Sequence, residues 1–126
     1  MRLSSLANLL AGKLSAPEFS AEIAEELLVH TRGLQKLGGS APVVVSQDTD
    51  VVLDRGGLST LCRLFASDQL SAAELAYTAD ALQLSERVDF TEPSVADDLA
   101  ECTDPVINGP LTVARALEIA GAGNAA

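Results

Sequence analysis

Apolar residues recur every three or four positions along several stretches of the chain, which is the spacing of an α-helix. The first stretch has leucines at positions 3, 6, 9 and 10, with serine and asparagine between them. This pattern predicts an amphipathic helix over about 3–12 that ends at Gly12. The same spacing predicts further helices over about 16–36, 58–67, 72–84, 94–102 and 112–120. The predicted core positions in two of them are Ile23, Leu27, Leu34 and Leu37, then Leu75, Ala79 and Leu82.

Two of these helices begin with a capping box, in which a serine at the cap is followed three residues later by a glutamate. The two pairs are Ser15 with Glu18 and Ser71 with Glu74. A leucine precedes each serine, as in a hydrophobic staple. We therefore predict two helix–turn–helix hairpins. Residues 6–19 and 61–75 also resemble each other, which leaves an internal duplication open.

The middle of the chain is rich in valine and has no helical spacing. Val43–Val45 and Val51–Leu53 flank a turn-like segment, so they are either two short strands or an extended excursion over the helices. Val88–Phe90 is a third extended candidate that would pair with one of them. The dipeptides Gly38-Gly39 and Gly56-Gly57 are interpreted as chain breaks.

A chain of 126 residues fits one domain, and the halves flanking the glycine pairs are too small to hold separate cores. We predict one mainly α domain over 1–126. It is a compact bundle of about six helices, built on the two hairpins, with a short extended or two-stranded segment in the middle. Residues 121–126 are expected to form a frayed tail.

The net charge of −10 is unevenly distributed. Residues 1–47 hold four acidic and four basic side chains, so the whole surplus lies in 48–126. This balance argues against a nucleic acid or an anionic membrane as partner, because both need a basic surface. A basic protein partner is compatible with it. No apolar run approaches the ~20 residues that span a bilayer, and we expect a cytoplasmic protein.

The stretch 86–104 carries seven acidic residues against Arg87 alone. It is either a solvated face or a docking surface for a basic protein. The predicted partner-binding residues are Asp89, Glu92, Asp97, Asp98, Glu101 and Asp104, with an extension to Asp48, Asp50 and Asp54.

The residues that most often carry catalysis or bind metals are few in this chain. His30 is the single histidine, and its place late in a helix favours a capping or surface role. Cys62 and Cys102 lack CxxC spacing, so we expect two buried thiols in different helices and no zinc site.

Asp48, Asp50 and Asp54 resemble the opening of a calcium loop, but Leu53 stands where that loop needs glycine. No phosphate-binding glycine motif is present. The predicted function is therefore non-enzymatic, with no catalytic residue, no cofactor and no metal.

The segment with Gly12, Leu14, Ser15, Glu18 and Phe19 resembles the opening of small helical bacterial immunity proteins of the colicin D type. The resemblance covers about 25 residues and implies a cytosolic antitoxin whose acidic surface masks a basic nuclease active site. The Val-rich middle segment and the number of helices depart from that pattern.

A different class of function is a small acidic secretion or assembly chaperone. Such a protein holds a client segment in an apolar groove instead of on a charged face. Val43–Val45 and Val51–Leu53 favour this alternative, because either would offer a strand edge.

Overall fold

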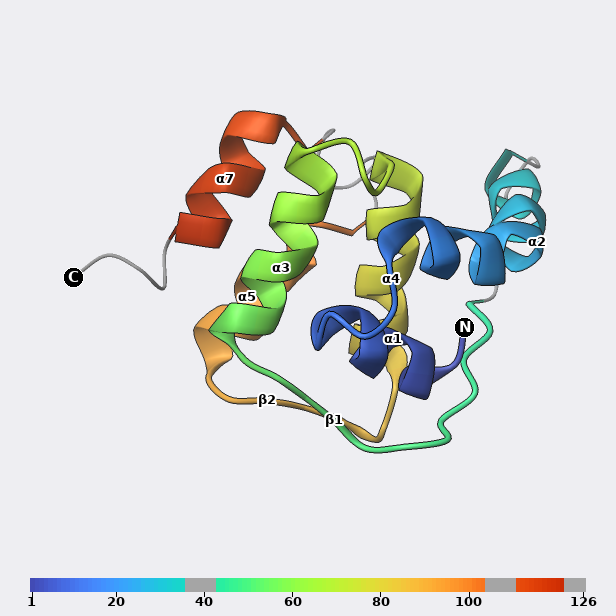
Figure 1. Ribbon diagram of the computed structural model, residues 1–126, viewed down its shortest axis with the longest axis horizontal. Helices are drawn as coiled ribbons and strands as arrows, with labels where there is room; N and C mark the ends of the chain where they lie inside the picture. Colours follow the sequence, from blue (N-terminus) through green and yellow to red (C-terminus); the bar gives the residue numbers. More distant parts are fainter. Residues whose placement is uncertain (36–42, 104–110, 122–126) are drawn as a thin grey trace.

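The computed structural model describes residues 1–35, 43–103 and 111–121, and Figure 1 shows their arrangement. Within these residues the chain is mainly α, with six helices and one short parallel sheet, as predicted. The elements are α1 (Leu3–Leu10), α2 (Ala16–Gln35), β1 (Val51–Leu53), α3 (Arg55–Ala66), α4 (Ala72–Leu84), β2 (Val88–Phe90), α5 (Pro93–Ala100) and α7 (Val113–Gly121). Of the predicted tail, only Gly121 is described, and it is the last residue of α7.

The two predicted hairpins, α1–α2 and α3–α4, are both confirmed. Gly12 has a φ of +75°, and the Lys13 and Leu14 amides that follow both donate to the Asn8 carbonyl and so close α1. Ser71 caps α4 with a full capping box, since the Glu74 amide donates to its hydroxyl at 3.1 Å and its own amide donates back to Glu74. These local signals fix where the helices of both hairpins begin and end.

The start of α3 corrects the interpretation of Gly56-Gly57 as a chain break. The helix begins at Arg55, three residues earlier than predicted, so both glycines lie in its first turn. The Asp54 carboxylate caps this turn by accepting a hydrogen bond of 2.7 Å from the Gly57 amide. A Cβ atom on Gly57 would lie 2.9 Å from Leu53 Cδ1, so close packing explains why glycine stands there.

The two strands form a parallel pair with Val51 opposite Val88, Val52 opposite Asp89 and Leu53 opposite Phe90. The α3–α4 hairpin connects them, which is why they run in the same direction. Val43–Val45 does not form a strand. The chain there is an extended excursion that meets the N-terminus, where Ser46 bridges to Arg2.

The core surrounds α3, which packs against α1, α4, α5, α7 and β1 (Figure 1). Leu75, Ala79 and Leu82 are buried as predicted, and so is Ile23, while Leu27 is half-buried. The side chains of Leu34 and Leu37 lie outside the described part of the chain. A buried hydrogen bond of 2.7 Å from the Ser59 hydroxyl to the Ala120 carbonyl ties α3 to α7.

His30 is buried, which corrects the prediction of a capping or surface role. Its ring meets the edge of Tyr77, with 4.9 Å between the ring centroids. Seven residues separate His30 from the buried Ile23, so helical spacing places both on the inner face of α2. Tyr77 in turn accepts a hydrogen bond of 3.2 Å from the Val44 amide, and burial raises the pKa of its hydroxyl.

Candidate functional site

Three of the six predicted partner-binding residues present exposed carboxylates along one segment of the chain. Asp89 lies on β2, Glu92 precedes α5 and Asp97 lies on α5. None of the three forms an ion pair with a described residue. We call this set the β2–α5 acidic face.

Asp98 and Glu101 are each engaged by an arginine from another helix. Asp98 accepts from Arg55 Nη1 at 2.6 Å, and the same guanidinium donates to the Ser94 hydroxyl at 2.9 Å. Arg115 donates twice to Glu101 and once to Glu118. The hydrogen bonds from Arg115 hold the pKa of Glu101 below its usual value.

These ion pairs have a structural effect on α5. Arg55 opens α3 and Arg115 lies on α7, so α5 is fastened to two neighbours through the carboxylates of a single face. Asp104 lies outside the described residues. The part of the predicted surface that is available to a partner without breaking an ion pair is therefore the β2–α5 acidic face.

The three aspartates predicted to extend this surface all have local partners. Asp48 accepts from the amide and the hydroxyl of Ser4 at the start of α1, at 2.9 and 2.6 Å, and these hydrogen bonds lower its pKa. Asp50 pairs with Arg87 at 2.8 Å, and Asp54 caps α3. In the described ranges no three side chains of the usual ligand types converge on a possible metal position.

The outer side of the two-stranded sheet joins apolar and acidic groups. Val52 is 63% exposed and lies in register with the exposed Asp89. The Asp50–Arg87 ion pair lies two residues earlier in each segment, immediately before the two strands. The sequence does not reveal the exposure of Val52, because three apolar residues in a row carry no alternation that would show which of them faces solvent.

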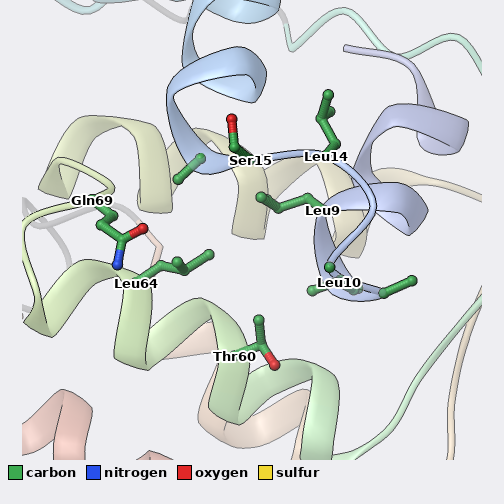
Figure 2. Close-up of a pocket in the computed structure, with 10 residues that line it drawn as sticks. Leu9, Leu10, Leu14, Ser15, Thr60, Leu64 and Gln69 are labelled. Atoms are coloured by element: carbon green, nitrogen blue, oxygen red, sulfur yellow. The ribbon is translucent and has the colours of Figure 1, made fainter.

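An open groove runs between α1 and α3. One hollow of about 430 Å³ is shown in Figure 2, where Leu9, Leu10 and Leu14 lie opposite Thr60 and Leu64 of α3. A second hollow of about 410 Å³ shares Leu10, Ala11 and Thr60 with it and reaches Val52 of β1. We call the two hollows together the α1–α3 groove; its walls include Ala7, Leu10, Ala11, Val52, Thr60 and Leu64, and Asp50 and Asp54 line its end beside β1.

The two thiols are buried, as predicted. Cys62 lies on α3, while Cys102 lies just after α5 instead of inside a helix. The Cys102 thiol donates to the Asp98 carbonyl at 3.6 Å, and its proximity to Cys62 together with burial raises its pKa. Buried structural cysteines are inert, so this pair offers little for covalent chemistry.

No helix in the described parts of the chain combines the length and the apolar character that a bilayer crossing requires. No protein-family model, curated protein or solved structure matches the chain. The likeness to immunity proteins of the colicin D type therefore stays a prediction that rests on the residues from Gly12 to Phe19.

Proposed function

We propose that the protein is a non-enzymatic module that binds a basic protein partner through the β2–α5 acidic face. One observation carries the proposal: Asp89, Glu92 and Asp97 are exposed and lack an ion pair among the described residues, while Arg55, Arg87 and Arg115 are engaged with other carboxylates. The acidic face thus retains its charge for an external partner.

The mechanism is electrostatic. Exposed carboxylates attract a basic surface over a distance of about 10 Å at 0.1 M salt and speed the encounter. Arginine side chains of the partner then form charge-assisted hydrogen bonds with them. Because α5 is fastened to α3 and α7, Asp97 sits on a supported helix, and binding orders little of the backbone.

A bacterial immunity or antitoxin-like inhibitor is the specific form of this function that the N-terminal resemblance supports. Its acidic face would cover the basic active site of a nuclease. The surplus of negative charge in residues 48–126 is in keeping with that role. The chaperone alternative is favoured by a different observation, the open α1–α3 groove next to the exposed Val52 of β1.

The test is affinity capture from the native cell with four baits, followed by mass spectrometry. The baits are the wild-type protein, the double variant Asp89→Asn/Asp97→Asn, a control double variant Glu25→Gln/Asp68→Asn, and the variant Glu92→Gln. We expect the wild-type bait and the control bait to capture a basic protein. The Asp89→Asn/Asp97→Asn bait should capture about tenfold less of it.

Added salt provides the second arm of this experiment. Capture that depends on the acidic face weakens strongly between low and high ionic strength. Equal retention by all four baits, or retention insensitive to salt, would show that the acidic face does not bind the partner.

A further inference from the structure

The two edges of β1 differ. The Val51 amide donates to the Arg87 carbonyl at 3.0 Å, and the Leu53 carbonyl accepts from the Thr91 amide at 3.1 Å. The peptide groups of Val51 and Leu53 therefore face β2. Neighbouring residues of a strand direct their peptide groups to opposite sides, so the amide and carbonyl of Val52 face away from β2.

No hydrogen bond within the described residues uses this outward amide or carbonyl of Val52. The end of the α1–α3 groove adjoins the same residue, since Val52 lines the hollow together with Ala7 and Leu10 of α1 and Ala11 at its C-cap. An unused donor and acceptor thus stand beside a hollow of about 410 Å³ that is lined by both apolar and acidic residues.

The charges around Val52 determine which peptide segments are favoured at this position. Asp50 and Asp54 flank β1 and line the same hollow, and Asp89 lies in register with Val52 on the neighbouring strand. Arg87 offsets only Asp50, so the surroundings of Val52 keep a negative balance. A segment with basic side chains is favoured there, and an acidic segment is repelled.

We propose that Val52 and the α1–α3 groove bind an extended segment of the partner in which apolar and basic residues alternate. This inference rests on the proposed function, because it specifies which part of a basic partner is recognised. An extended chain places alternate side chains on opposite faces. Its apolar side chains enter the hollow beside Leu10, and its basic side chains reach Asp54, which forms no ion pair with a described residue.

The strand offers a single amide and a single carbonyl, so backbone pairing alone is too weak to hold a segment. The apolar hollow and the carboxylates supply the remainder. The recognised segment therefore needs both apolar and basic side chains. The order of these residues along the segment should matter as much as their number.

The probe is a synthetic heptapeptide with blocked ends and the order Arg-Val-Arg-Val-Arg-Val-Arg. The control peptide has the same composition with all valines placed before all arginines. Binding is followed by amide chemical shifts in NMR titrations of the whole chain. We expect the alternating peptide to shift the resonances of Val52, Leu10 and Ala11, and the control peptide to bind about tenfold more weakly.

Two substitutions separate the backbone edge from the hollow. Val52→Pro removes the outward amide while keeping all bonds to β2, and Val52→Thr keeps that amide as its control. Ala11→Phe fills the hollow from an exposed position, and Ala24→Phe adds the same ring elsewhere. We expect about tenfold weaker peptide binding for Val52→Pro and for Ala11→Phe, and little change for the controls.

The outcomes distinguish this inference from the proposed function. Wild-type peptide binding by both Ala11→Phe and Val52→Pro, or no binding of the alternating peptide, overturns the inference, whatever Asp89→Asn/Asp97→Asn does in the capture experiment. Loss of peptide binding in these variants, with capture unaffected by Asp89→Asn/Asp97→Asn, upholds the inference and moves the partner site to the groove. If Val52→Pro instead changes the sedimentation coefficient of the protein and leaves peptide binding unchanged, a second copy of the chain occupies the outer edge of β1. The inference is then again overturned. If circular dichroism shows that Val52→Pro is unfolded, Ala11→Phe alone decides.

Discussion

Glu101 accepts two hydrogen bonds from Arg115, one of 2.7 Å from Nη2 and one of 2.8 Å from Nε. This bidentate pair joins the end of α5 to α7, two elements that the sequence separates by a long connector. A carboxylate that was predicted to bind a partner is thereby used to hold the protein's own helices together.

The pair makes stability depend on pH. Arg115 lowers the pKa of Glu101 in the folded protein below the ordinary value of 4.5. A lowered folded pKa means that the stabilisation is fully present above about pH 4.5 and is lost as the pH falls through the folded pKa. We expect Glu101→Gln to be less stable than the wild type at pH 7, and the difference to shrink as the pH falls below 4. Urea unfolding at several pH values measures it, and a difference that grows towards low pH would contradict the assignment.

The serine caps at the start of α2 and α4 should contribute to the stability of the fold. The amides of Glu18 and Glu74 donate to Ser15 and Ser71 at 3.3 and 3.1 Å. Replacing either serine by alanine removes one cap and should lower the free energy of unfolding by about 1 kcal/mol. Ser71→Thr keeps the hydroxyl and serves as the control. Urea curves that superimpose for the wild type and both alanine variants would reject the caps.

The two glycines at the start of α3 should respond in opposite ways to alanine. A Cβ on Gly57 meets Leu53 Cδ1 at 2.9 Å, whereas on Gly56 its nearest neighbour is Asp54 Oδ1 at 3.4 Å. We expect Gly57→Ala to destabilise the fold by roughly 1–3 kcal/mol through overpacking. Gly56→Ala should be neutral or stabilise by up to about 1 kcal/mol, since alanine favours a helix. Thermal unfolding of the two variants measures this difference. Similar shifts of the melting temperature in both variants would be inconsistent with the packing around Leu53.

The buried thiols give a prediction about reactivity. Cys62 and Cys102 are both buried, and the Cys102 thiol donates to the Asp98 carbonyl at 3.6 Å. Neither should react with a thiol reagent at pH 8 in the folded protein, and both should react at once in concentrated urea. Single variants Cys62→Ala and Cys102→Ala assign the signals. Rapid reaction of one thiol per folded chain would show that a path to solvent exists.

Local signals predicted most of the helices. The Ser-x-x-Glu pairs and the helical spacing of apolar residues act within a few positions, so α1, α2 and α4 were placed correctly to within a few residues. The sequence also predicts Val88–Phe90 as an extended segment that would pair with one of the two valine-rich stretches, and it pairs with Val51–Leu53. At Gly56-Gly57 the composition misled, because the Asp54 cap and the contact with Leu53 outweigh the usual cost of glycine in a helix.

The candidate site was harder to predict, because it depends on which residues meet in space. The acidic surplus was visible in the sequence, but the approach of Arg55 to Asp98 and of Arg115 to Glu101 follows from helix packing across long separations. The α1–α3 groove was not predicted for the same reason. Its walls combine leucines, alanines, Val52 and Thr60 with two aspartates, and no spacing distinguishes these residues from ones that pack fully.

The parallel arrangement of β1 and β2 has a consequence for how the protein acquires its structure. Three residues on each side make a ladder too short to persist alone, and the strands meet only after the α3–α4 hairpin has turned the chain around. The sheet thus depends for its stability on helix packing elsewhere in the chain. The arrangement of Val52 beside Asp89 on the surface is accordingly a property of the completed fold.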